Sequence, residues 1–508
     1  MKYLLSPLLL LSLLPSQTLS FEASGGGIGK NVSYKISGGK ANQKFIFATS
    51  LYRASTPLIF LDNIETRSFG IGFDLTPAWI FGPLDAAGTR SFGATLPNDP
   101  GLIGKAILHQ VVTYPGTGRY ALDGISEVVV VPMGNAGVFA AQTSKMSTPR
   151  QFASNIPLPD GKVMIVAGAT NRLLWQTALK TTDIFDPATR SFTRGPDLIQ
   201  ARSTHTQTLL DDGRYLLAGG VNEKNVAIAT CEVYDPKTGK FTAVGSLAYK
   251  RTYHGAVKMK DGRVVVIGGF EDMGAILGAQ QALESGRVQT EIFDPKTNLW
   301  SAGRSLRTGR GAPGVQDIGN GKILIIGGVY KTPRSGPDLS LTCEIYDMTT
   351  GWITSARSLP VRTAWTTTYQ LPGNKILMAG GNAGPSGSIR NYSNFATKSC
   401  YIYDANTNLW SRVGALPVAT SGGRALTLRD GTLVIAGGGD NTLYYPHGNK
   451  GLYSFNPTTR TWSTLGLLVE GRQSPEAFEL QAGGIAVIGG GAHKNRADSV
   501  DTWELMVR

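Results

Sequence analysis

Six arginines stand at one recurring position of the sequence, each about eleven residues before a glycine-containing turn. A guanidinium carries its N–H donors in one plane and can bind a carboxylate or a sulfate through two parallel hydrogen bonds. If the fold brings these positions together, the side chains either form a ring that binds acidic groups of a ligand or hold neighbouring segments of the chain in place. The six are Arg150, Arg202, Arg251, Arg310, Arg362 and Arg472, and a further copy has Thr420 at this position with Arg424 nearby.

Two histidines follow the arginines at a shared spacing. His205 lies three residues after Arg202, and His254 lies three residues after Arg251, directly behind Tyr253. An imidazole can ligate a metal or transfer a proton near neutral pH. The chain has no P-loop, no nucleophile elbow and no His-Glu-x-x-His motif around which such chemistry could be assigned. We therefore predict that His205, Tyr253 and His254 bind a ligand together with the arginines, and we assign no catalytic residue, no metal and no cofactor.

These residues belong to a repeat of about fifty residues that fills the chain from about residue 137. Each copy contains a short apolar run, rich in β-branched residues, that ends in Gly-Gly. Such runs are typical of buried strands, and self-similarity at this period indicates a repeat architecture. The runs cover 213–220, 262–269, 321–328, 374–381, 431–438 and 484–490, and a degenerate copy starts at Gly161.

A second element follows the apolar run in each of the first six copies. It begins with an acidic or polar residue, continues with alternating apolar residues, and ends in an Asp-Pro-like turn and an aromatic residue. Asp accepts backbone N–H groups in such turns and Pro fixes φ, so two strands joined by a tight turn are predicted. Each copy thus supplies four strands, which is the plan of a propeller blade. The elements cover 182–192, 231–241, 290–300, 343–352, 400–410 and 452–462.

Over about 370 residues the copies resemble kelch repeats, because Gly-Gly, Tyr/Phe-Asp-Pro and Trp/Phe recur at fixed offsets. The chain is thus similar to the galactose oxidase-like kelch superfamily, in an exported bacterial form. In the copper oxidases of that superfamily, a Tyr-His pair similar to Tyr253-His254 supplies copper ligands, with another Tyr, another His and a Tyr cross-linked to Cys. Tyr444 or Tyr445 and His447 could be nominated for the remaining ligands, although no spacing requires them.

The two ends of the array indicate how the propeller closes. The seventh copy stops after its third strand at 500–507, and a matching fourth-strand pattern appears at 137–150. A sheet built from both segments leaves no open strand edge between the first and last blades. We predict an all-β fold, a seven-bladed kelch β-propeller at 137–508 whose blade 7 is closed by 137–148 and 472–508.

The N-terminal part has a different organisation. Residues 1–20 have the pattern of a secretory signal peptide, with Lys2, an apolar core at 4–14 and small residues before the cut. Residues 21–136 lack the repeat and alternate as short strands between turns, which predicts a small β-sandwich-like domain. We expect the protein in the periplasm or outside the cell, with no transmembrane segment after signal removal.

The net positive charge of the chain limits the classes of partner that we expect. The chain has 49 Lys plus Arg against 36 Asp plus Glu, and the excess lies in the repeats. In an exported protein this favours a glycan, an anionic surface polymer or a protein partner over nucleic acid. We predict a binding protein that recognises its partner through the long loops of one face. Two alternatives stay open: a carbohydrate-active enzyme, either sugar-acid epimerase-like or a copper radical oxidase, and a structural or adhesive surface protein.

Three cysteines stand at the start of the third strand in different copies. These are Cys231, Cys343 and Cys400, and Thr182 and Thr290 fill the same position elsewhere. Interchange with Thr indicates a small packed residue, and equivalent atoms of separate blades are too far apart for a disulfide, which needs Cα atoms within about 7 Å. We predict three free, mostly buried thiols.

Overall fold

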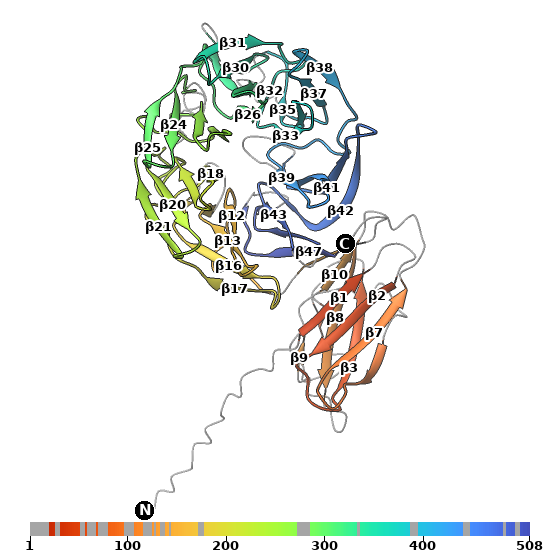
Figure 1. Cartoon of the computed structure of the whole chain (residues 1–508). Helices are drawn as coiled ribbons and strands as arrows, with labels where there is room; N and C mark the ends of the chain where they lie inside the picture. Colours follow the sequence, from red (N-terminus) through yellow and green to blue (C-terminus); the bar gives the residue numbers. More distant parts are fainter. Residues whose placement is uncertain are drawn as a thin grey trace, which may run out of the picture. The chain divides into compact units, whose positions relative to one another are not determined.

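The computed structural model consists of strands, turns and loops, and it divides into two compact units, Met1–Ala140 and Ala141–Arg508 (Figure 1). Among the described residues, no helix is long and apolar enough to cross a membrane. The predicted signal peptide lies outside the described residues, apart from its last residue. The structure describes residues 20–25, 31–50, 56–57, 68–69, 80–95, 106–114, 124–125, 129–132, 138–141, 144–170, 177–271, 285–332, 336–386, 395–439, 448–480, 484–492 and 498–507.

The first unit contains two main antiparallel sheets, one with the order β1-β2-β7 and one with the order β10-β8-β3-β6, to which β9 adds. Phe92 of β7 stacks on Tyr34 of β2 and on Phe45 of β3, with ring centroids 5.2 and 6.0 Å apart. These aromatic rings join the two sheets, as expected for a sandwich-like unit. The strands are β1 (Ser20–Gly25), β2 (Asn31–Ser37), β3 (Lys44–Ser50), β6 (Ile80–Pro83), β7 (Arg90–Thr95), β8 (Ala106–Tyr114), β9 (Gly124–Ile125) and β10 (Val129–Pro132), and β4 (Thr56–Pro57) pairs with β5 (Ser68–Phe69).

From β11 (Val138–Ala141) onward, the described residues form seven four-stranded antiparallel sheets, which we number as blades. Blades 1 to 3 are β12 (Ser154–Pro157), β13 (Val163–Val166), β16 (Thr182–Asp186) and β17 (Ser191–Arg194); β18 (Thr206–Leu209), β19 (Tyr215–Ala218), β20 (Cys231–Asp235) and β21 (Lys240–Val244); and β22 (Gly255–Lys258), β23 (Val264–Ile267), β24 (Thr290–Asp294) and β25 (Leu299–Ala302). Blades 4 to 6 are β26 (Gly314–Asp317), β27 (Lys322–Ile326), β30 (Cys343–Asp347) and β31 (Trp352–Ala356); β33 (Thr367–Leu371), β34 (Lys375–Ala379), β37 (Cys400–Asp404) and β38 (Leu409–Arg412); and β39 (Arg424–Thr427), β40 (Leu433–Ala436), β41 (Asn449–Asn456) and β42 (Thr461–Arg472).

Blade 7 combines segments that are far apart in the sequence. Its order is β11-β47-β44-β43, with β11 (Val138–Ala141), β43 (Glu476–Glu479), β44 (Ile485–Ile488) and β47 (Trp503–Val507). The blades surround a common centre, with β12, β18, β26, β33, β39 and β43 near it and β17, β21, β25, β31, β38 and β42 at the outside (Figure 1). The fold is therefore an all-β propeller. Short strands at one end of the blades are β14 (Ala169–Thr170), β15 (Thr177–Ala178), β28 (Val329–Thr332), β29 (Gly336–Leu339), β32 (Thr363–Ala364), β35 (Asn382–Ala383), β36 (Phe395–Ala396), β45 (Gly491–Ala492) and β46 (Asp498–Ser499).

The second strand of each blade is buried on both faces, which explains its unbroken apolar run. In β23 all four side chains are buried. Val264 and Val266 pack with side chains of blade 2, whereas Val265 and Ile267 pack with side chains of blade 4. A strand between two packed neighbours gains apolar burial from both sets of residues, about 1.5–3 kcal/mol for each large side chain. The core is therefore a series of interfaces between blades.

Trp503 is the test of ring closure, because it lies in the last strand of the chain and packs against blade 1. It is fully buried, its ring centroid is 4.4 Å from that of Phe185, and its Nε1 donates to Ser144 Oγ at 2.9 Å. We expect Trp503→Ala to lower the free energy of unfolding by about 3–5 kcal/mol. The matched control Trp352→Ala removes a ring that is 62% exposed and should cost less than about 0.5 kcal/mol. Equal losses in urea denaturation of the two variants would contradict this role.

Candidate functional site

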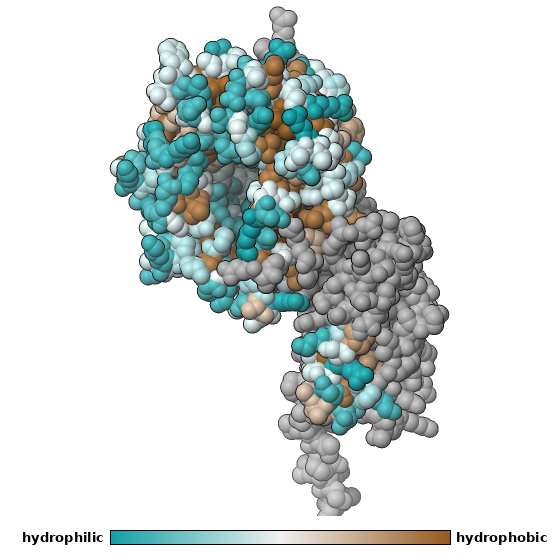
Figure 2. Space-filling view, turned by 45° about the vertical axis from the view of Figure 1, so that its right-hand side comes forward, coloured by the Kyte–Doolittle hydropathy of each residue, from teal (hydrophilic) through white to brown (hydrophobic). Residues whose placement is uncertain are grey.

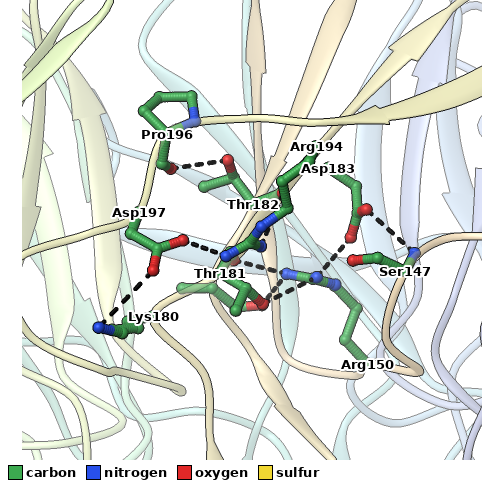
Figure 3. A network of polar contacts seen from close by, with 10 residues as sticks. Ser147, Arg150, Lys180, Thr181, Thr182, Asp183, Arg194, Pro196 and Asp197 are labelled. Carbon is green, nitrogen blue, oxygen red and sulfur yellow. Dashed lines mark hydrogen bonds and ion pairs between the residues drawn. The ribbon is translucent and has the colours of Figure 1, made fainter.

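Five of the six predicted arginines form the same buried clamp inside their own blades. Nη1 donates to the carbonyl oxygen of the residue seventeen positions later, at 2.7–2.9 Å, and to a second carbonyl just before the third strand. Nη2 pairs with a carboxylate on the third strand; Figure 3 shows the clamp of blade 1, where Arg150 lies 2.5 Å from Asp183. The pairs are Arg150–Asp183, Arg202–Glu232, Arg251–Glu291, Arg310–Glu344 and Arg472–Glu504.

The carboxylate of each clamp also fixes the chain that enters the blade. Glu232 accepts from the backbone N–H of Ile199 at 2.9 Å, and Glu291 accepts from that of Ala248 at 2.6 Å. The arginines of these pairs are 0–1% exposed. Burial lowers the pKa of Arg150 to about 10, which leaves the guanidinium charged at neutral pH. These five arginines therefore hold protein segments together, which is the second of the two roles that the sequence left open, and do not form a ligand-binding ring.

Arg362 does not share the clamp position, and its predicted place in the set is wrong by one residue. The backbone N–H of Gly328 donates to the carbonyl oxygen of Thr363. At the preceding blade interface, the equivalent N–H of Gly269 donates to the carbonyl oxygen of the clamp arginine Arg310. Thr363, and not Arg362, therefore occupies the clamp position. Asn374, with φ of 60°, takes the turn position that glycine holds in most other blades. Eleven residues before Asn374 stands Thr363, whereas the same count from Gly373 gives Arg362. Arg362 instead donates to Leu339 O at 2.9 Å and is about one-quarter exposed.

Blades 5 and 6 replace both members of the clamp at once. Thr363 and Thr420 stand at the arginine position, and Tyr401 and Tyr453 stand at the carboxylate position. In blade 6 Tyr453 donates to Asn449 Oδ1 at 3.1 Å, and Asn449 donates to Thr420 Oγ1 at 2.8 Å. In blade 6, hydrogen bonds between three uncharged side chains thus replace the ion pair, so no charge is left buried without a partner.

Two positions after the clamp arginine, or after the threonine that replaces it in blades 5 and 6, the backbone is left-handed in every blade. Five backbone hydrogen bonds join these residues from one blade to the next, such as Ala312 N–H to Tyr253 O at 2.9 Å and Trp365 N–H to Ala312 O at 3.2 Å. Left-handed φ costs a non-glycine residue about 1–2 kcal/mol, so the surrounding contacts must impose it. We call this set the inner ring: Phe152, Thr204, Tyr253, Ala312, Trp365, Gly422 and Ser474, with φ between 46° and 61°.

A cavity of about 260 Å³ lies against the inner ring, which we call the axial pocket. Five blades contribute to it, each with the ring residue and one or two that follow. Its wall includes two predicted ligand-binding histidines and Tyr253, so the structure brings these three residues together. The lining residues are Phe152, Ala153, Thr204, His205, Tyr253, His254, Gly422, Gly423, Arg424, Ser474, Pro475 and Glu476.

The two histidines of the axial pocket are uncharged. His205 Nε2 lies 3.0 Å from Ser154 Oγ, and His254 Nε2 lies 2.8 Å from Thr206 Oγ1, each a hydroxyl of the preceding blade. Burial, with a smaller effect of nearby arginines, lowers the pKa of His205 to about 3 and that of His254 well below its ordinary value. The Nδ1 atoms of both rings are buried and have no hydrogen-bond partner among the described residues. Two neutral ring nitrogens in the wall of the pocket are therefore left without a hydrogen bond.

A charged pair completes the wall. Arg424 Nη2 lies 3.2 Å from Glu476 Oε2, which also accepts from Asn155 Nδ2 at 2.5 Å. Glu476 is 3% exposed, and burial raises the pKa of its carboxyl. The sequence offered a signal for Glu476 that we missed: the equivalent residue of blades 1 to 4 is small, as Gly255 in blade 3.

Two of the residues that line the pocket, Phe152 and Tyr253, are aromatic. Phe152 and Tyr253 meet edge to face with ring centroids 6.1 Å apart, and Trp365 lies 6.5 Å beyond Tyr253 in the same geometry. Burial raises the pKa of the Tyr253 hydroxyl. The pocket thus combines an apolar wall with a small number of fixed polar groups, which is the usual composition of a ligand site.

The cysteines play no part in this site. Cys231, Cys343 and Cys400 are free and buried, which confirms the sequence prediction. Burial raises the pKa of their thiols to about 11, 12 and 11. They are therefore protonated packing residues, because only the thiolate is strongly nucleophilic.

The structure resembles that of a fungal alcohol oxidase of the AA5 family in complex with copper. The two share 18% sequence identity and a TM-score of 0.56, over 73% of this chain and 76% of the oxidase. The structure of YjhT gives a TM-score of 0.48 at 16% identity, over 63% of this chain and 99% of that one. The likeness to the oxidase shows the fold alone. No family model and no curated protein matches the sequence.

The residues of the axial pocket do not fit a copper site. Within the described ranges, no three His, Cys, Asp or Glu side chains come together in a way that could hold a metal ion. Burial of Tyr253 disfavours the phenolate that would act as a ligand. The other residues nominated from the sequence, Tyr444, Tyr445 and His447, lie outside the described residues. We assign no step to a metal.

The clamp predicts a specific pattern of stability changes. Glu232→Gln leaves the buried Arg202 without its carboxylate and should cost about 3–5 kcal/mol in urea denaturation. Arg202→Thr combined with Glu232→Tyr, the residues of blade 5, should cost less than the sum of the single changes. Asp261→Asn, which removes the exposed partner of Arg263, is the control and should cost less than about 1 kcal/mol. A strictly additive double variant would contradict the clamp.

The neutral histidines predict acid sensitivity. Their folded pKa values lie below the unfolded value, near 6.5, so the unfolded chain binds more protons as the pH falls below about 6.5. The free energy of unfolding should therefore fall as the pH drops below 6.5, by up to roughly 1.4 kcal/mol per pH unit for each histidine, and the contribution of His205 should extend to about pH 3. His205→Phe with His254→Phe should show a flatter dependence in urea denaturation from pH 7 to pH 4.5. An unchanged slope would show that these rings are protonated in the folded state.

Proposed function

We propose that the protein binds an uncharged, hydroxyl-rich ligand, a small sugar or the end of a neutral glycan, in the axial pocket. The main support is His254, a lining residue of the pocket that is 6% exposed and whose buried Nδ1 atom has no hydrogen-bond partner among the described residues. Leaving such an atom without a hydrogen bond costs about 1–3 kcal/mol. A ligand hydroxyl would supply the missing bond, either as donor or as acceptor.

Charge favours a neutral ligand over an acidic one. The clamp arginines are occupied inside the blades, and Arg424 already pairs with Glu476. An added carboxylate would have to displace that pair, whereas hydroxyl groups can bond to the neutral rings of His205 and His254 without displacing any charge. The aromatic faces of Phe152 and Tyr253 supply apolar contact for the C–H side of a sugar ring. The cavity volume of about 260 Å³ suits a compact ligand.

The pattern of residues 1–20 supports a further proposal, that the chain is exported. Neutral glycans of a cell surface or its surroundings would then be accessible to it. Binding rather than catalysis is the proposal, because the paired charges and neutral histidines of the pocket fix polar groups without providing an activated nucleophile.

Calorimetric titration of the full chain with a panel of neutral mono- and oligosaccharides tests this function. We expect saturable binding of at least one panel member that His254→Phe weakens at least tenfold, because one hydrogen bond worth about 1.4 kcal/mol is lost. Arg362→Gln is the control, since its side chain lies outside the pocket, and it should leave affinity within twofold. Binding that survives His254→Phe but is lost in Arg362→Gln would refute the proposal, as would a preference for uronic acids over their neutral counterparts that His254→Phe abolishes.

A further inference from the structure

Four exposed arginines lie along the outer strands of blades 4 and 5 or in the segment that leads to them. They are Arg304, Arg307, Arg357 and Arg412, and we call them, together with Trp352, the rim patch. None of the four forms an ion pair with an acidic side chain of the described residues. Hydrophilic residues cover much of the propeller face visible in Figure 2, so an excess of one charge, rather than polarity itself, distinguishes this patch.

The members of the rim patch are connected through β31. The Arg304 guanidinium lies over the ring of Trp352, 5.4 Å from its centroid, and this ring is 62% exposed. Arg307 donates to Ile353 O at 3.3 Å and to Ser355 Oγ at 3.4 Å. Arg357 follows directly on the last residue of β31. Two arginines that precede blade 4 thus lie along its outermost strand, and a third extends from the end of that strand.

The patch continues onto blade 5. The Arg357 N–H donates to Asn408 Oδ1 at 2.8 Å, and its carbonyl accepts from Trp410 Nε1 at 3.0 Å. Trp410 belongs to β38, whose last residue is Arg412. The five residues of β31 alone span about 15 Å at the rise of a strand. The basic surface is therefore longer than a single small anion.

At the outer edge of blade 1, the positive charges are neutralised by an acidic side chain. There the exposed Arg194 and Lys180 both pair with Asp197 (Figure 3). Asp197 lies in the segment that leads from blade 1 to blade 2, five residues before the clamp position of blade 2, and in the segments that lead to blades 4, 5 and 6 that place is taken by Ser305, Ser358 and Ala415. The arginines of the rim patch thus lack the acid that neutralises the equivalent region of blade 1.

We propose that the rim patch binds an anionic polysaccharide chain, with arginines on its carboxylate or sulfate groups and Trp352 against a sugar ring. Planar guanidinium groups suit both anions, which they bind through paired hydrogen bonds. The exposed indole adds contact that depends on shape rather than charge. A polymer matches the length of the patch and its continuation across two blades. This surface lies at the outer strands and shares no residue with the axial pocket, so either site can exist without the other.

Titration of the full chain with a soluble polyuronate and with heparin, at 0.1 M salt, tests the rim patch, with dextran as the uncharged probe. We expect saturable binding of at least one anionic polymer and none of dextran. Arg304→Ser, Arg307→Ser and Arg357→Ser combined should weaken binding at least tenfold. Trp352→Ala, which changes no charge, should weaken it at least threefold, an effect that general electrostatic attraction would not produce.

The matched control removes the same charge elsewhere. Lys224→Ser, Lys237→Ser and Lys240→Ser combined, at exposed positions of blade 2, should weaken binding less than threefold. An equal loss in the lysine variant, or unchanged affinity in Trp352→Ala, would overturn the proposal in favour of diffuse attraction. Tighter binding of single-stranded DNA of matched charge, or no binding of either anionic polymer, would also overturn it. His254→Phe should leave polymer binding unchanged, so this test fails or succeeds independently of the axial pocket.

Discussion

Each blade of the propeller is apolar on both faces, and this constraint determines the rest of the structure. A sheet such as β22–β25 cannot bury both faces alone, so it needs a neighbour on each side. Trp503 and Phe185 meet that need where the last strand of the chain packs on blade 1. A closed ring brings equivalent residues of every blade to one axis. The inner ring is the direct result, because its members occupy one repeat position and bond to each other through the backbone.

The proposed binding site lies where the repeats around the ring differ. The position four residues after the clamp is small or uncharged in blades 1 to 5, but it is Arg424 in blade 6 and Glu476 in blade 7. His205 and His254 likewise interrupt a position that holds Ala153 and Pro475 in other blades. These departures face one cavity. The same reasoning applies to the rim patch, where blades 4 and 5 lack the acid that balances blade 1.

The sequence was sufficient for the fold but only partly for the site. Gly-Gly pairs and Asp-Pro turns specify local backbone geometry, so their recurrence predicts the blades without knowledge of any contact. The arginines were identified, but their role was decided by partners such as Glu232 that lie about thirty residues away in the chain. Arg362 was misplaced because Asn374 can adopt the left-handed φ that glycine usually provides. Glu476 was missed although it departs from the small residues of other blades at its position, and only the structure shows that its charge is buried.

The central claim is that His205 and His254 are neutral groups whose free ring nitrogens bind a hydroxyl-rich ligand. The ¹⁵N chemical shifts of their imidazoles test it directly, and assignment is practical because the chain has 5 histidines. We expect both rings to have the shifts of neutral imidazole at pH 5 and their Nδ1 resonances to move when a binding neutral sugar is added. Shifts of a protonated imidazole at that pH, or Nδ1 resonances unchanged at saturating sugar, would contradict the claim.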